Sequence, residues 1–236
     1  MLQALKKRCI ARLLMLCLSV FCLLSPAVAD EVDDWFIAIQ NDHTGKVEDM
    51  LKAGFDPNTV ETKRGDTGLI LAMREDSNRV LDILLADKRT KLDASAFNGD
   101  NALMIACYKG NEQAVLKLLK KGAKVDKNGW TPLHYAAANG NNKIVKMLLV
   151  RDAFVNAASP NGTTPVMMAA EAGHIYTVRL LYDNGADLTI TNQQKLSAID
   201  FANMNQNKAI AEGIQHLIEK DEEMDRIRNT LPKFPF

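Results

Sequence analysis

A short segment of the chain, TPLHYAA from Thr131, recurs with changes along most of the sequence. The related segments DWFIAI, TGLILAM, NALMIAC, TPVMMAA and SAIDFAN begin at Asp33, Thr67, Asn101, Thr164 and Ser197. Successive starts lie 34, 34, 30, 33 and 33 residues apart. A period of about 33 residues is typical of a solenoid, in which one supersecondary unit stacks on the next. The sequence therefore predicts about six copies of one structural unit.

Each copy has the same internal order of polar and apolar residues. In the fourth copy, Thr131 can cap a short Ala-rich helix that Pro132 opens, because the missing N–H of proline falls where a helix has no acceptor. A polar turn leads to a second helix, whose apolar stripe has the spacing i, i+3, i+4, as at Val145, Leu148 and Leu149. One unit cannot bury this stripe alone, whereas a stack can. The predicted fold class is therefore all-α, with one continuous core.

The motif at residues 131–136, TPLHYA, resembles the TPLH-x-A signature of the ankyrin repeat family, and residues 164–169 carry part of it. The segments GAKV at Gly122 and GADL at Gly185 resemble the loop entry of the same family. The resemblance covers about residues 33–218, and Gln215 replaces the expected leucine in the sixth copy, as suits a terminal repeat with a polar outer face. It implies a solenoid of helix-turn-helix repeats with loop or hairpin fingers, and a monomeric, non-catalytic module that binds another protein.

Residues 1–29 have the pattern of a secretory signal. Four basic residues and no acidic one precede an apolar run at residues 13–24, and Ala27 and Ala29 are the small residues expected before a cleavage site. The run is shorter than the ~20 residues that cross a bilayer core. We expect cleavage between Ala29 and Asp30, a periplasmic or secreted protein, and no stable membrane insertion afterwards. An uncleaved anchor is the alternative.

The chain then divides into a signal at 1–29, a repeat domain at 30–218, and a charged helix end with a Pro/Phe tail at 219–236. Cleavage leaves 25 basic and 29 acidic residues, a net charge of −4, which gives no support to nucleic-acid binding. Cys107 becomes the only cysteine, so the chain has no internal disulfide, and its apolar surroundings predict a buried, inert thiol.

The sequence offers no catalytic or metal-binding motif. It has no nucleophile elbow, phosphate-binding glycine loop or C-x-x-C pair. His134 belongs to the repeat signature and is expected to bond to nearby loop backbone. His43 and His174 hold the same turn position four copies apart, roughly 30–40 Å at ~8–10 Å per packed helix, so they cannot share a metal. His216 is expected to face solvent. We therefore expect no enzyme activity, no cofactor and no metal.

The resemblance implies that a partner contacts the concave side, at the residue before each cap and at the end of each first helix. The candidate residues are Trp130, Tyr108, Lys109, Arg74, Glu75, Asp100, Asn139 and Glu171. Trp130 and Tyr108 are the expected anchors, because Trp and Tyr often dominate interface energies. The alternative is that Trp130 only covers its own helix.

The 30-residue step makes the loop before Trp130 three residues shorter than its counterpart in the fourth copy. This predicts a gap in the row of fingers, unless the deletion is a neutral surface change. The C-terminal tail LPKFPF is a rival binding segment. The sequence does not name the partner. Besides a general protein-binding module, it allows an accessory factor that protects a periplasmic enzyme, such as an oxidative-stress enzyme, or a secreted effector or toxin that acts on a host protein.

Overall fold

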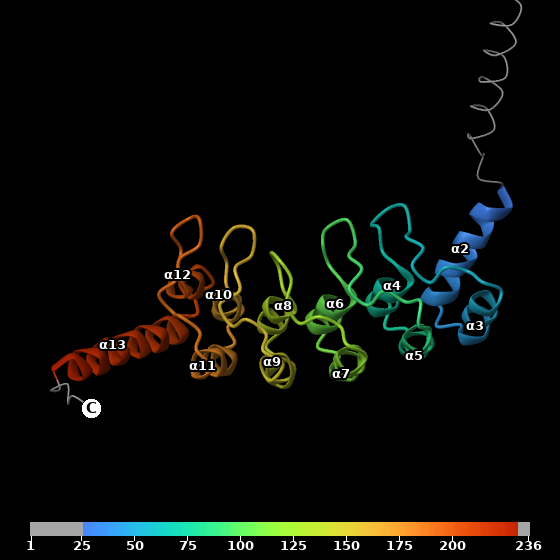
Figure 1. Cartoon of the computed structure of the whole chain (residues 1–236). Helices are drawn as coiled ribbons and strands as arrows, with labels where there is room; N and C mark the ends of the chain where they lie inside the picture. The colour runs from blue at the N-terminus through green and yellow to red at the C-terminus, as the bar shows by residue number, and fades with distance from the viewer. Residues whose placement is uncertain (1–25, 231–236) are drawn as a thin grey trace, which may run out of the picture.

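The computed structural model describes residues 26–230. The apolar run at 13–24 and the tail at 231–236 lie outside the described residues. Figure 1 shows two parallel rows of helices, with loops projecting as fingers beyond one row. The inner row, beside the fingers, comprises α2 (Pro26–Gln40), α4 (Gly68–Arg74), α6 (Ala102–Tyr108), α8 (Pro132–Asn139), α10 (Pro165–Glu171) and α12 (Ala198–Met204). The outer row comprises α3 (Thr44–Lys52), α5 (Asn78–Ala86), α7 (Glu112–Lys121), α9 (Asn142–Leu149), α11 (Ile175–Asp183) and α13 (Lys208–Thr230). The predicted all-α solenoid of six helix pairs is confirmed.

The inner helices begin where the repeat pattern places their caps, except in the first copy. The capping residues of α4, α6, α8, α10 and α12 are Thr67, Asn101, Thr131, Thr164 and Ser197. In α6, for example, the side chain of Asn101 accepts a hydrogen bond of 2.9 Å from the N–H of Met104. The expected cap at Asp33 is wrong, because α2 already begins at Pro26 and Asp33 lies inside it. Among the described residues no finger precedes this helix, so the contacts that place the other caps do not fix its start.

The apolar stripes of the outer helices meet the inner helices in one continuous core. The buried stripe residues are Val47 and Met50, Leu81, Leu84 and Leu85, Val115, Leu118 and Leu119, Val145 and Leu148, and Val178 and Leu181. The last stripe position is only half-buried in three copies, at Leu51, Leu149 and Tyr182. Helix α13 closes the stack with Ile214 and Leu217, and its Gln215 is exposed as expected. The helix then continues past residue 218 to Thr230 and projects from the end of the stack (Figure 1).

Neighbouring repeats are joined by the same hydrogen bond at the base of each finger. A side-chain oxygen of one repeat accepts a main-chain N–H of the next at 2.8 to 3.2 Å, in the pairs Asn58 with Lys91, Asp93 with Lys124, Asp126 with Phe154, and Asn156 with Asp187. The regular spacing of these bonds fixes the register between repeats. Successive fingers are therefore joined in a regular row beside the inner helices.

Candidate functional site

One residue of each inner helix lies in the same register along the row, four positions after the capping position. These residues are Ile37, Leu71, Ile105, Tyr135, Met168 and Phe201, and all are apolar or aromatic. Leu71 and Ile105 are buried, whereas Tyr135 and Met168 are half-buried and line a surface hollow. The repeat pattern therefore places a row of apolar side chains along the inner helices. The row is buried in the second and third copies, half-buried in the fourth, fifth and sixth, and exposed at Ile37 in the first.

The hollow in this row, called the aromatic hollow below, is lined by Tyr108, Trp130, His134, Tyr135, Ala138 and Met168 and has a volume of about 190 Å³. Trp130 stands edge-on to Tyr135 with ring centroids 6.4 Å apart, and Tyr108 does so at 6.2 Å. Such edge-to-face pairs are favourable ring geometries. The volume is below the ~300–1,000 Å³ of common small-molecule pockets, so the hollow fits a single side chain of a protein partner better than a free metabolite.

His134 forms the floor of the aromatic hollow and is structural, as predicted. Its Nε2 lies 2.9 Å from the carbonyl oxygen of Thr163 in the next repeat, and its Nδ1 accepts the N–H of Thr131 at 3.1 Å. Burial lowers the pKa of His134 below its usual value, so the neutral ring is favoured. The Trp130 ring lies edge-on to this imidazole at 5.1 Å. Trp130 therefore covers its own helix and also lines the hollow.

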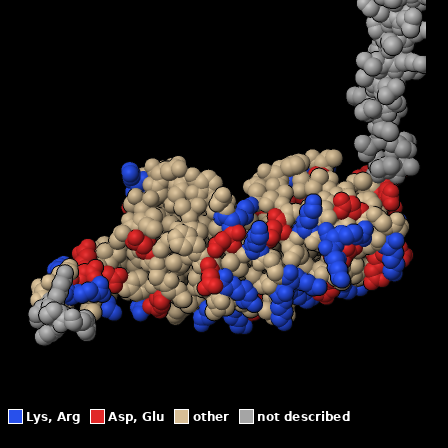
Figure 2. All heavy atoms as spheres, in the orientation of Figure 1, with Lys and Arg blue, Asp and Glu red and all other residues tan. Residues whose placement is uncertain are grey.

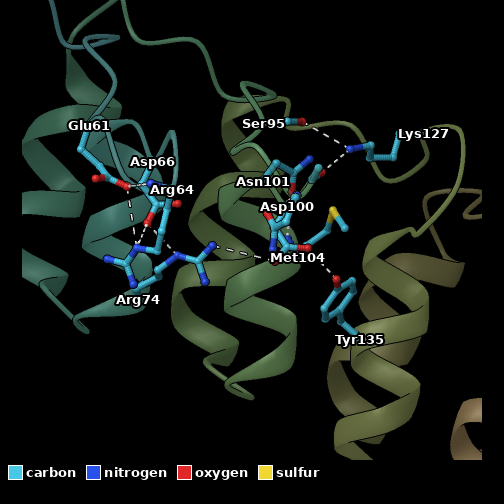
Figure 3. Close-up of polar contacts among 12 residues, drawn as sticks. Glu61, Arg64, Asp66, Arg74, Ser95, Asp100, Asn101, Met104, Lys127 and Tyr135 are labelled. Atoms are coloured by element: carbon cyan, nitrogen blue, oxygen red, sulfur yellow. Dashed lines mark hydrogen bonds and ion pairs between the residues drawn. The ribbon is translucent and has the colours of Figure 1, made fainter.

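A partly buried hydrogen-bond and charge network holds Tyr135 in place (Figure 3). The Tyr135 hydroxyl donates to the carboxylate of Asp100 at 2.5 Å, and a nitrogen of Arg74 lies 3.9 Å from the same carboxylate. Arg74 also donates to Asp66 at 2.8 Å. Burial, and then the bond to Asp100, raise the pKa of the Tyr135 hydroxyl, so it stays protonated and remains a donor. The network links the second, third and fourth repeats behind the aromatic hollow.

The expectation that the residue before each cap is exposed is wrong for three of the four positions. Asp66, Asp100 and Thr163 are buried, and only Trp130 is partly open. The chain turns inward under the finger at this point, and the two carboxylates meet Arg74 there instead of a partner. Removing the arginine would leave Asp66 with Arg64 at 3.2 Å and Asp100 with no ion-pair partner among the described residues, so Arg74 and Asp100 have structural roles.

The residues at the ends of the inner helices also join repeats. Lys109 donates from Nζ to the carbonyl oxygen of Arg74 and to Asp76, and Asn139 donates to the carbonyl oxygen of Tyr108 at 2.8 Å. The carbonyl oxygen of Glu171 accepts from two asparagines of the sixth repeat at 2.9 and 3.0 Å.

The structure thus brings only two of the eight sequence candidates, Tyr108 and Trp130, into one hollow. Glu75 lies exposed outside it. Tyr135 and Met168 belong to the hollow and were not among the candidates. Both residues occupy the position written x in TPLH-x-A. This position is apolar or aromatic in all six copies, and that pattern could have identified them.

The predicted gap in the finger row lies beside Trp130. Figure 2 shows a notch in the upper edge of the molecule, at the place of the loop between α7 and α8 in Figure 1. The notch has a volume of about 490 Å³, and its lining includes Asn128 and Gly129 on one side and Phe154, Ala157 and Ala158 on the other.

Neither a membrane span nor a metal site is present among residues 26–230. No helix in this range is long and apolar enough to cross a bilayer. No group of three or more His, Cys, Asp or Glu side chains in the range is arranged to hold a metal ion.

Comparisons with known proteins agree with the fold. A family model described as ankyrin repeats, in three copies, matches residues 35–128, 71–159 and 123–192. "Transient receptor potential cation channel subfamily A member 1" of Homo sapiens is 28% identical over 177 residues, which cover 68% of this chain and 16% of that protein. "B-cell lymphoma 3 protein homolog" of Mus musculus is 33% identical over 151 residues, which cover 61% of this chain and 33% of that protein. The chain thus spans a third or less of these relatives.

One solved structure matches over nearly its whole length. It is titled "Bd0816 Predatory Endopeptidase from Bdellovibrio bacteriovorus in complex with immunity protein Bd3460", and the match has a TM-score of 0.68 and 25% identity. The match covers 78% of this chain and 97% of the other. The neighbour is an immunity protein bound to a protein partner. Ankyrin repeats are, as a family, interaction modules rather than catalysts, and on the family match, the fold and the capped repeats, this chain belongs to the ankyrin repeat family.

Proposed function

We propose that this chain is an exported, monomeric ankyrin repeat protein that binds and restrains an endopeptidase of its own compartment, with the aromatic hollow as the anchor point. The similarity to an immunity protein bound to an endopeptidase carries the proposal, because it extends over 97% of that chain. The aromatic hollow supports it from the geometry. It is preformed, apolar and the size of one side chain.

The class of partner follows from the neighbour. An immunity protein acts on an enzyme, which favours the accessory-factor interpretation over a secreted effector. The enzyme named with it is an endopeptidase, which favours this class over an oxidative-stress enzyme.

Export rests on the signal pattern of residues 1–29 and on where the core begins. Among residues 30–230, whose burial the structure describes, Trp35 and Ile39 are the first large fully buried side chains, and both follow the expected cleavage point before Asp30. Cleavage there would therefore keep every core residue described. N-terminal sequencing of the exported protein should give Asp30 as the first residue, and retention of Met1 would instead indicate an anchored protein.

Binding is tested with the full chain purified from the exported fraction and with each exported endopeptidase of the source organism, purified singly. We expect one of these enzymes to bind and to lose activity. Trp130→Ala should raise Kd about 5- to 30-fold, which corresponds to ~1–2 kcal/mol. The control is Tyr176→Ala, because Tyr176 is 79% exposed on the outer helix α11, and this change should leave Kd within about twofold. No binding by any of the enzymes, or equal losses for the two variants, would contradict the proposal.

A further inference from the structure

Four of the five fingers are closed by a main-chain hydrogen bond across their turn. The bonds run from Glu61 to Asp66, Ala96 to Asp100, Ser159 to Thr163 and Asn192 to Leu196, at 2.8 to 3.0 Å. Fingers one (56–66) and two (91–100) are also joined to each other, as are fingers four (154–163) and five (187–196). The N–H of Phe97 donates to the carbonyl oxygen of Arg64 at 2.8 Å, and the N–H of Gln193 donates to that of Asn161 at 2.9 Å. The donor in both cases is the residue four positions before a cap.

Finger three, residues 124–130, has none of these bonds. Within the described chain, no main-chain hydrogen bond closes its turn, and none joins it to the finger on either side. Two features of the sequence cause this. The finger is three residues shorter than finger four, and the residue of finger four at the donor position is Pro160, which has no N–H to donate. The finger row is therefore two closed pairs with an open edge between them.

Side chains hold the open finger in place. Nζ of Lys127 donates to the carbonyl oxygen of Gly99 and lies 3.3 Å from the Ser95 hydroxyl (Figure 3). The carboxylate of Asp126 accepts the N–H of Phe154. The finger is thus positioned by its neighbours. The N–H of Lys124 donates to Asp93, but among the described residues the main-chain groups of residues 125–130 have no hydrogen-bond partner. A positioned edge of unpaired N–H and C=O groups is a template for another extended segment.

The notch beside this edge has small side chains on the side of finger four. Ala157 and Ala158 border it and let another main chain approach, whereas at Gly129 finger three comes close to Pro160 of finger four. The notch adjoins Trp130 of the aromatic hollow, which directly follows Gly129 in the chain. In the two closed pairs, neighbouring fingers are joined by main-chain hydrogen bonds of 2.8 and 2.9 Å.

We propose that an extended segment of the partner enters this notch and forms main-chain hydrogen bonds with finger three, in the place of the missing hairpin contact. The inference rests on the proposed function, since the partner is the endopeptidase whose apolar side chain fills the aromatic hollow. The two sites are adjacent, so one segment can supply both contacts. Addition of a strand to an open edge is a recurrent mode of peptide recognition.

The direct test closes the notch. Copy four carries Ala157, Ala158 and Ser159 where copy three has a gap, so an Ala-Ala-Ser insertion between Asp126 and Lys127 restores the 33-residue step. We expect it to raise Kd for the endopeptidase at least tenfold. The matched control is the same insertion at the tip of finger five, after Gln193, which should leave Kd within about twofold.

A second variant guards against misfolding of the insertion. Ala158→Trp fills the notch from an exposed position without a change of length, and it should weaken binding to a similar extent. Circular dichroism should show both variants folded. Hydrogen exchange of the complex should show residues 124–130 protected at least tenfold, and residues 61–66 of finger one unchanged.

The outcomes separate the two proposals. If the unaltered chain binds the endopeptidase and Trp130→Ala weakens binding, while both notch variants bind normally and residues 124–130 stay unprotected, the notch inference is wrong and the proposed function stands. If the unaltered chain binds none of the exported endopeptidases, both are wrong.

Discussion

Replacement of Tyr135 by phenylalanine separates the stability of the solenoid from its binding. The change removes one oxygen atom, which donates at 2.5 Å to Asp100, a residue only 7% exposed. A hydrogen bond to a charged group contributes roughly 1.5–3 kcal/mol, and the carboxylate left behind keeps only Asn98 at 2.7 Å and Arg74 at 3.9 Å. We expect the free energy of unfolding to fall by about 1.5–3 kcal/mol. The ring stays in the wall of the aromatic hollow, so Kd for the endopeptidase should change by less than about twofold.

Urea unfolding followed by far-UV circular dichroism measures the first quantity, and titration of the endopeptidase measures the second. Tyr108→Phe is the matched control, because Tyr108 is 60% exposed and its hydroxyl has no hydrogen-bond partner among the described residues. Its loss of stability should stay within ~0.5 kcal/mol. Equal losses for the two variants would refute the claim that Asp100 holds Tyr135. A large rise in Kd for Tyr135→Phe would show that the hydroxyl itself contacts the partner.

Three further predictions concern the core and its titrating groups. Leu118→Ala, in the middle of the stack, should lower the free energy of unfolding, measured with urea, by ~2–5 kcal/mol. His43→Ala should lower it by less than ~1 kcal/mol. Near-equal losses would contradict the periodic core. Burial lowers the pKa of His134 in the folded chain. Just below pH 6.5 this imidazole therefore binds a proton in the unfolded chain but not in the folded one. Stability should therefore decline as pH falls below about 6.5. His134→Gln should flatten that decline, whereas His216→Gln at an exposed position should not. Burial raises the pKa of the Cys107 thiol, which should react with a thiol reagent only after unfolding, and rapid labelling of the native chain would refute its burial.

Local patterns in the sequence were sufficient to predict the solenoid. Thr131 and Pro132 mark a helix start through contacts within a few residues, and the stripe at Val145 and Leu148 follows from helix geometry alone. The start of α2 could not be predicted, because Asp33 aligns with the caps of the other copies and nothing in its own copy shows that the helix begins earlier.

The site was harder to predict because its geometry depends on contacts between repeats. Asp100 lies next to a cap and has the character of an exposed residue, but it is buried by Arg74 from the repeat before and Tyr135 from the repeat after. The short step predicts a gap beside Trp130. The open edge of finger three also requires Pro160 in the next repeat, and that effect is visible only once the pattern of donors along the fingers is known.

The central claim is that the partner contacts the aromatic hollow on the inner helices. Site-specific photo-crosslinking tests it most directly, with p-benzoylphenylalanine in place of Tyr108 in one sample and in place of Tyr176 in another. Both positions are exposed tyrosines, one in the hollow and one on the outer helix α11. After irradiation with the endopeptidase, we expect a covalent complex from position 108 and none from position 176. Crosslinking from position 176 alone would place the partner on the outer helices and contradict the account.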